Sequence, residues 1–287
     1  MEPGKLKSDP YFNRLRKKEY SRLDRQGHVY LDYTGGNLHP QCLLDAHYRY
    51  LKNAVYGNPH STNPASLLSE RFVTEAREKV LEFFNAQDYY CVFTNNASGA
   101  LQIVGECYPF SIGSHFLLTA DNHNSVNGIR EYCLNKGGKH SYCPMNYEDL
   151  TINEDALNKQ LNLHRDKKNK LFAFPAQSNV SGVQHSLLWI GKAQEKGWDV
   201  LLDAAAFVPT NQLDLAIVQP DFVSLSFYKI FGYPTGIGCL LIKKSKFNCL
   251  EKPWFAGGTV SLASAQYSGY FLKHYMEIGR ASCRERV

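Results

Sequence analysis

The sequence predicts an α/β protein in which a mainly parallel sheet carries helices on both faces. Two observations predict this class. Short apolar runs alternate along the chain with longer segments whose apolar residues recur at helical spacing, an alternation typical of βα units. Several apolar runs also end in polar or glycine-rich segments, the places where open α/β sheets build their sites.

Six apolar runs are predicted to be buried strands, at residues 90–94, 115–119, 171–174, 199–203, 222–225 and 238–242. Three other segments have the apolar spacing of helices, at residues 66–84, 98–107 and 186–196. We therefore expect strands and helices to alternate through most of the chain.

The composition is that of a globular protein and argues against several partners. The 287 residues carry a formal net charge of +5, and the basic runs at 14–18 and 164–168 are typical of solvated surface, so no nucleic-acid site is expected. No apolar run could span a bilayer, and no secretory signal begins the chain. The eight cysteines form no CxxC pair and the histidines no ligand spacing, so we expect reduced thiols, no metal, no membrane contact and a cytoplasmic protein.

Asp203 is the first candidate site residue. It ends an apolar strand and precedes three alanines, so its carboxylate is expected at the carboxyl edge of the sheet beside side chains that leave room for a flat ring. A carboxylate opposite a pyridine nitrogen keeps that nitrogen protonated, which makes the ring an electron acceptor. By itself, an aspartate at this place is equally well explained as the N-cap of a helix.

Lys229 is the second candidate. It follows the next apolar strand, in a segment rich in aromatic residues and glycine, and apolar surroundings favour the neutral amine that attacks an aldehyde. A lone lysine is most often a surface residue. The pairing of an aspartate after one strand with a lysine after the next is much more specific.

Residues 228–238, YKIFGYPTGIG, resemble the Schiff-base motif of class V pyridoxal 5'-phosphate (PLP) enzymes. Within that class the chain is most similar to the N-terminal, cysteine-desulfurase-like domain of molybdenum cofactor sulfurases. The likeness runs from about Tyr30 to Ser264, and its motifs, including residues 30–36 and 57–61, occur in family order. The resemblance implies the PLP-dependent transferase fold type I, with a seven-stranded, mainly parallel sheet, and PLP as the cofactor.

The resemblance also implies roles for single residues. Lys229 would hold PLP, Asp203 would face its pyridine nitrogen and His123 would stack on its ring, and these three are the expected catalytic residues. The other implied cofactor contacts are Ala97, Ser98, Ser226 and Tyr228 at the phosphate, Asn179 at the phenolic oxygen, and Thr259 at the phosphate bound by a partner subunit.

The chain departs from the family at three positions. Asn122 stands where a glutamate usually precedes the stacking histidine, so proton delivery is expected to differ. Tyr228 stands where many cysteine desulfurases have histidine. Ala206 stands where they have glutamine, which puts one hydrogen bond to the cofactor in doubt.

The function implied by the resemblance is a homodimeric cysteine desulfurase of the molybdenum cofactor sulfurase type. Such an enzyme moves sulfur from L-cysteine to an enzyme cysteine and then to an acceptor, but no cysteine of this chain can be assigned that role. Two alternatives stay open. One is another class V reaction, by an aminotransferase, lyase or epimerase, and the other is a non-catalytic scaffold of the same fold.

Three regions are expected along the chain: an N-terminal segment at 1–29, a PLP-binding large domain at 30–276 and a tail at 277–287. The tail resembles the translation of a sequencing-library adapter, and we leave it out of the functional argument. On this interpretation the chain is truncated and lacks the small C-terminal domain with its carboxylate-binding arginine and nucleophilic cysteine. The fragment alone is then expected to be inactive.

Overall fold

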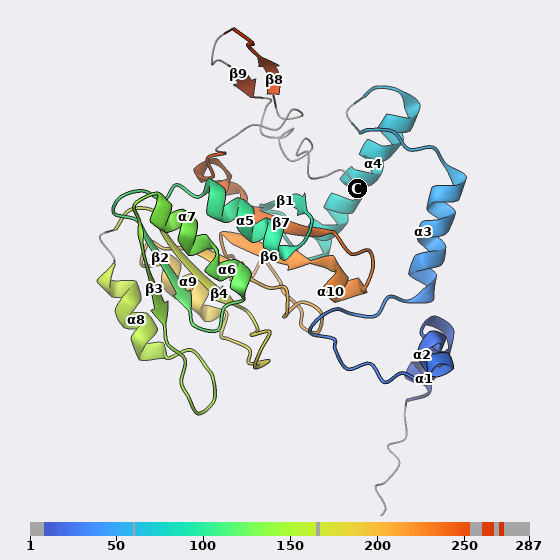
Figure 1. Cartoon of the computed structure of the whole chain (residues 1–287), viewed down its shortest axis with the longest axis horizontal. Coiled ribbons are helices and arrows are strands. Elements are labelled where there is room, and N and C mark those ends of the chain that lie inside the picture. Colours follow the sequence, from blue (N-terminus) through green and yellow to red (C-terminus); the bar gives the residue numbers. More distant parts are fainter. Residues whose placement is uncertain (1–8, 60, 165–166, 253–259, 267–269, 273–287) are drawn as a thin grey trace, which may run out of the picture.

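The computed structural model describes residues 9–59, 61–164, 167–252, 260–266 and 270–272, which include a large α/β body with N-terminal helices at its side (Figure 1). The main sheet has seven strands in the order β1-β7-β6-β5-β4-β2-β3. They are β1 (Tyr89–Thr94), β2 (His115–Thr119), β3 (Lys139–Cys143), β4 (Lys170–Pro175), β5 (Asp199–Asp203), β6 (Phe222–Ser226) and β7 (Gly238–Lys243). β7 runs antiparallel to β1 and β6, while the other neighbours are parallel. The prediction of a mainly parallel sheet is confirmed.

All six predicted strands are present, and β3 is the strand of the main sheet that sequence analysis missed. It lies at the edge of the sheet, and of its five residues only Cys143 is buried. An edge strand has one neighbour and need not be apolar on both faces. Its sequence, KHSYC, therefore lacks the apolar run by which the other strands were found.

The three predicted helices correspond to α4 (Pro64–Phe83), α5 (Ala97–Cys107) and α9 (Leu188–Gln194). The helices that were not predicted are α1 (Pro10–Glu19), α2 (Ser21–Gln26), α3 (Gln41–Asn53), α6 (Asn124–Asn127), α7 (Ile129–Asn135), α8 (Glu154–Leu163) and α10 (Phe227–Phe231). A short 3-10 helix, η1 (Lys244–Cys249), follows β7, and β8 (Val260–Ala263) pairs with β9 (Tyr270–Leu272). In the described part of the chain, no helix has the length and apolar character required to cross a bilayer.

Helices cover both faces of the main sheet, as predicted. Alternate residues of β4 enter two separate cores, because successive side chains of a strand point to opposite faces. Phe172 and Phe174 pack with α8 and α9, whereas Leu171 and Ala173 pack with α5 and α7. The carboxyl edge of the parallel strands is thus held between two packed layers.

The N-terminal part of the chain reaches the large body at α10. The backbone N–H of Asn37 donates to the carbonyl oxygen of Tyr228 over 3.2 Å, and the Asn37 side chain donates to the carbonyl oxygen of Ile230 over 2.8 Å. α10 then ends at Gly232, whose φ is +74°. These contacts fix the end of the short helix that carries Lys229.

Candidate active site

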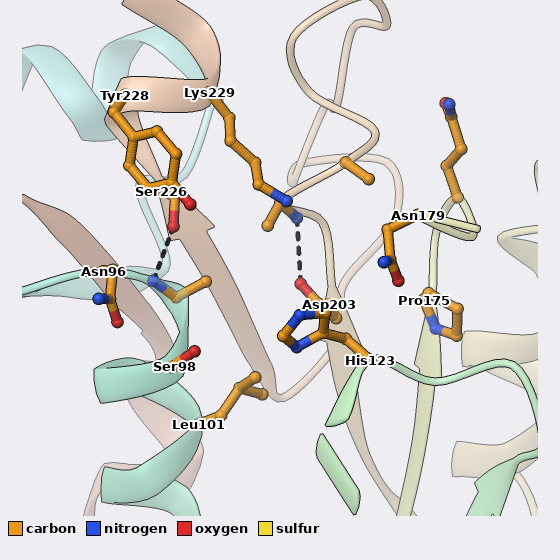
Figure 2. Close-up of a pocket in the computed structure, with 14 residues that line it drawn as sticks. Asn96, Ser98, Leu101, His123, Pro175, Asn179, Asp203, Ser226, Tyr228 and Lys229 are labelled. Carbon is orange, nitrogen blue, oxygen red and sulfur yellow. Dashed lines mark hydrogen bonds between the residues drawn. The ribbon is translucent and has the colours of Figure 1, made fainter. Parts of the chain in front are cut away.

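A pocket lies where β4, β5 and β6 end and where α5 begins (Figure 2). It holds about 510 Å³ of empty space, part of which is open to solvent. Every predicted site residue that the structure describes lines it: Ala97, Ser98, His123, Asn179, Asp203, Ser226, Tyr228 and Lys229. The remaining predicted contact, Thr259, lies outside the described residues. Residues far apart in the sequence are therefore brought together as the motifs predicted.

Asp203 presents its carboxylate to this pocket in a fixed orientation. It is the last residue of β5, and 8 % of it is exposed. One oxygen, Oδ1, accepts hydrogen bonds from the backbone N–H of Ala205 and the hydroxyl of Ser224, both over 3.1 Å. The described residues make no hydrogen bond to Oδ2. A ring nitrogen with a proton fits this second oxygen.

Lys229 enters the pocket from the opposite side. It lies on α10, which begins directly after β6, and Figure 2 shows its side chain extending toward the part of the pocket that holds Asp203 and His123. No described carboxylate lies within ion-pair distance of its amine. The amine is therefore not held in a salt bridge with these residues, and it is placed to react with a ligand in the pocket.

The beginning of α5 forms the end of the pocket best suited to an anion. Asn96 is the N-cap, since its side chain accepts from the N–H of Gly99 over 2.9 Å, so the alternative in which Ser98 is the N-cap is wrong. The N–H of Ala97 donates to the hydroxyl oxygen of Ser226 over 2.8 Å, which leaves the Ser226 hydroxyl hydrogen for a ligand. The N–H of Ser98 lies in the first turn and has no partner within the helix. These donors and the helix dipole fit a phosphate group.

His123 lies beside Asp203 in Figure 2 and begins the short helix α6. Its Nδ1 accepts from the backbone N–H of Ser125 over 3.1 Å, so the hydrogen of the neutral ring is on Nε2. This hydrogen bond orients the imidazole at the wall of the pocket.

Asn122, which stands in place of the family glutamate, does not line the pocket. Its buried amide donates to Thr119 and to the carbonyl oxygen of Ala173, and so attaches the loop to β2 and β4. Asn122 therefore holds the loop in place by donating to oxygen atoms. An amide can donate these hydrogen bonds, whereas a carboxylate cannot.

Sequence reasoning assigned no role to four of the lining residues: Asn96, Leu101, Pro175 and Gln177. Gln177 is the most informative of them. Its Oε1 accepts from the amides of Gln184 and Asn211, each over 3.3 Å, which leaves Nε2 as the group that can donate. Its place directly after β4 was the available signal. Gln177 therefore gives the pocket an amide group, which the alanine at position 206, where related enzymes have glutamine, does not.

The described residues show no group of three or more His, Cys, Asp or Glu side chains arranged to hold a metal ion. The reactive and charged groups around the pocket include one amine, one carboxylate, an imidazole and the donors at the start of α5. An amine for an aldehyde, a carboxylate for a ring nitrogen and a helix terminus for a phosphate match the three polar groups of PLP.

Fold and pocket together define the PLP-dependent transferase fold type I. The chain belongs to the aminotransferase class V family, whose sequence model matches residues 29–277. It is similar to molybdenum cofactor sulfurase of Solanum lycopersicum, with 37 % identity over 91 % of this chain and 36 % of that protein. In structure it is similar to apo cysteine desulfurase from Thermococcus onnurineus NA1, with a TM-score of 0.82, 25 % identity and coverage of 95 % and 66 % of the two chains.

A C-DES mutant with glycine covalently linked to its PLP cofactor shares the fold, with a TM-score of 0.74, 18 % identity and coverage of 93 % and 68 %. The chain spans about a third of the length of the curated relatives it matches. The activity of those longer proteins is therefore only proposed for this chain.

Proposed function

We propose that this chain is the PLP-binding part of a cysteine desulfurase of the molybdenum cofactor sulfurase type. One observation carries the proposal: Lys229, Asp203 and the start of α5 border a single pocket. The similarity to molybdenum cofactor sulfurase supports the choice of this reaction within class V.

The position of each side chain in the pocket indicates its role. Bound PLP supplies an electron sink for the negative charge that develops on the substrate. Oδ2 of Asp203 holds the proton on the ring nitrogen, because Oδ1 is already engaged by Ala205 and Ser224. The amine of Lys229 would hold the cofactor and, as a free amine, would accept the proton from the Cα atom of the substrate. His123, oriented by the hydrogen bond from the N–H of Ser125 to its Nδ1, would stack on the cofactor ring.

The sulfur-accepting cysteine is proposed to come from outside the described residues. None of the described cysteines lines the pocket. Burial raises the pKa of the Cys133 thiol to about 11 and of the Cys143 and Cys249 thiols to about 12, which disfavours the thiolate that attacks sulfur. The proposal also includes L-cysteine as substrate, a sulfur acceptor, a homodimer that completes the phosphate site through Thr259, and a cytoplasmic location.

Reduction of the PLP-loaded chain with borohydride tests the central contact. Peptide mapping is expected to find one phosphopyridoxyl group, on Lys229, and Lys229→Ala should remove it. Lys243→Ala, which changes a lysine at the end of β7, serves as the matched control and should leave the label in place. A label confined to another lysine would contradict the proposal.

A further inference from the structure

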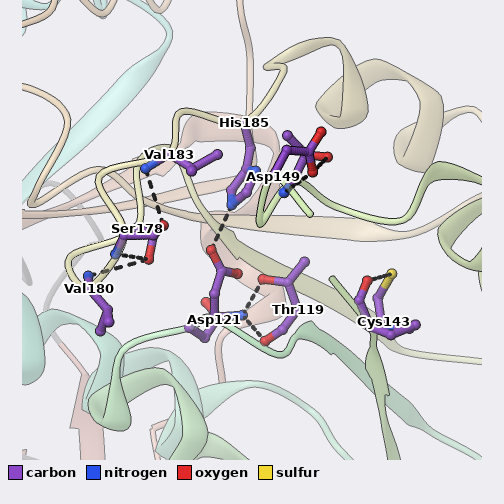
Figure 3. A network of polar contacts seen from close by, with 12 residues as sticks. Thr119, Asp121, Cys143, Asp149, Ser178, Val180, Val183 and His185 are labelled. Atoms are coloured by element: carbon purple, nitrogen blue, oxygen red, sulfur yellow. Dashed lines mark hydrogen bonds and ion pairs between the residues drawn. The ribbon is translucent and has the colours of Figure 1, made fainter. Parts of the chain in front are cut away.

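Figure 3 shows a pair of polar side chains, Asp121 and His185, joined by a hydrogen bond. Nε2 of His185 donates to Oδ2 of Asp121 over 2.7 Å, and the two side chains are 1 % and 15 % exposed. Neither residue lines the pocket. Each, however, belongs to a loop that does: Asp121 lies two positions before His123, and His185 follows the turn that carries Asn179.

The other hydrogen bonds made by the described residues of the two loops stay within one loop or reach a neighbouring strand or segment. In the second loop, the N–H of Ser178 donates to Val183 and the N–H of His185 donates to Ala176. In the first loop, Asn122 is attached to strands β2 and β4. Among the described residues, the contact of Asp121 with His185 is the hydrogen bond that joins one loop to the other.

Removing one partner of this pair should cost a different free energy from removing both. Oδ1 of Asp121 is buried without a hydrogen-bond partner among the described residues, so His185 is the donor that compensates the buried carboxylate. Removing one partner of such a pair costs much more than removing both, because a buried charge is left alone. A directional contact of this kind fixes the spacing of two loops in a way that apolar packing does not.

We propose that Asp121 and His185 are positioning residues that hold His123 and Asn179 at a fixed separation across the pocket. The inference rests on the proposed function for its consequence, the orientation of PLP. The link between the loops does not depend on it.

The test compares His185→Phe with His115→Phe at pH 8. His115 is a matched control, because it too is a buried histidine whose side chain makes one hydrogen bond, over 2.8 Å to Ser141, but it lies at the end of β2 away from the pocket. Hydrogen exchange of the cofactor-free chain is measured for peptides covering 119–127 and 176–186. The PLP dissociation constant and the circular dichroism of bound PLP are then measured.

His185→Phe is expected to speed exchange in both loops, to raise the PLP dissociation constant about tenfold and to change the dichroism of the cofactor. His115→Phe should change none of the three, even if both variants lower the melting temperature equally. If His185→Phe does not fold, the double variant Asp121→Leu, His185→Leu removes the pair without leaving a buried charge and should show the same exchange.

Faster exchange in one loop only, or equal changes in His115→Phe, would overturn the positioning role. If the unmodified chain binds no PLP, the proposed function fails, and the exchange measurement alone decides on the link between the loops.

Discussion

At the scale of single residues, two buried aspartates show how position decides role. Asp221 lies just before β6, and its Oδ2 accepts from the N–H of Val200 and the amide of Gln194. Burial raises the pKa of its carboxyl group. Asp203 lies at the other end of the sheet and keeps one oxygen for the pocket. Both carboxylates are buried, but only the one at the carboxyl edge of the sheet can meet a ligand.

Asp203→Asn is expected to impair chemistry more than cofactor binding. The neutral amide does not hold a proton on the ring nitrogen, so the ring accepts electrons less well. We expect a loss of about a hundredfold, or about 2.7 kcal/mol, in the exchange of the Cα hydrogen of bound L-cysteine with deuterated solvent. Asp221→Asn is the matched control and should leave this rate unchanged when equal amounts of folded protein are compared. Equal rates for Asp203→Asn and the unchanged chain would sink the role of Asp203.

At the scale of elements, the short helix α10 depends on a segment far away in the sequence. Five residues form too little helix to be stable alone, and Asn37 satisfies carbonyl groups at its end. Gly232 closes the helix in the left-handed region, where the backbone of residues 37–39 leaves no room for a Cβ atom. The position of Lys229 is therefore set by the N-terminal part of the chain as well as by β6.

Gly232→Ala is expected to lower the free energy of unfolding by on the order of 3 kcal/mol, through the positive φ and the overlap with residues 37–39. It should also weaken PLP binding, because α10 shifts. Gly191→Ala is the control: it lies within α9 with no atom near the added Cβ, and alanine favours a helix. Urea unfolding measures both. Equal stability of the two variants would contradict the packing of this segment on α10.

We expect the free energy of unfolding to depend on pH because of His115, the first residue of β2. Burial, with the nearby charges of His164, His140, Lys167 and Lys139, lowers the pKa of His115 from 6.5 to about 4. Between these values the unfolded chain binds the proton and the folded chain does not, so the free energy of unfolding falls as the pH falls. The loss is on the order of 2–3 kcal/mol by pH 4. His115→Phe should flatten this part of the curve in urea unfolding, and parallel curves would refute the cause.

At the scale of the whole molecule, the site is a product of strand topology. The parallel strands β4, β5 and β6 bring Pro175, Asp203 and Ser226 to one edge, and the antiparallel β7 is the next element after α10. Among the described side chains that line the pocket, Lys229 is the one that carries a cationic group. These residues therefore bind a cofactor but offer no second cation for a substrate carboxylate.

We expect the 287-residue chain to bind PLP but to release alanine and sulfide from L-cysteine at least a hundredfold more slowly than the longer Solanum lycopersicum relative, because substrate without a carboxylate partner is poorly oriented. Both products are measured with a reductant present, and keto acid is measured to detect another class V reaction. Sustained turnover by this chain would show that its own residues supply the missing groups.

The amino-acid sequence by itself determined the six apolar strands, the three helices α4, α5 and α9, and the pairing of Asp203 with Lys229. Those features depend on local periodicity and on motifs that are contiguous in the chain. Tertiary structure decided the polar edge strand β3, the antiparallel direction of β7, the place of Gln177 and the contact of Asp121 with His185. Each of these features depends on a partner that only folding brings close. The direction of β7 could not be predicted because an apolar run is buried equally well in a parallel or an antiparallel strand.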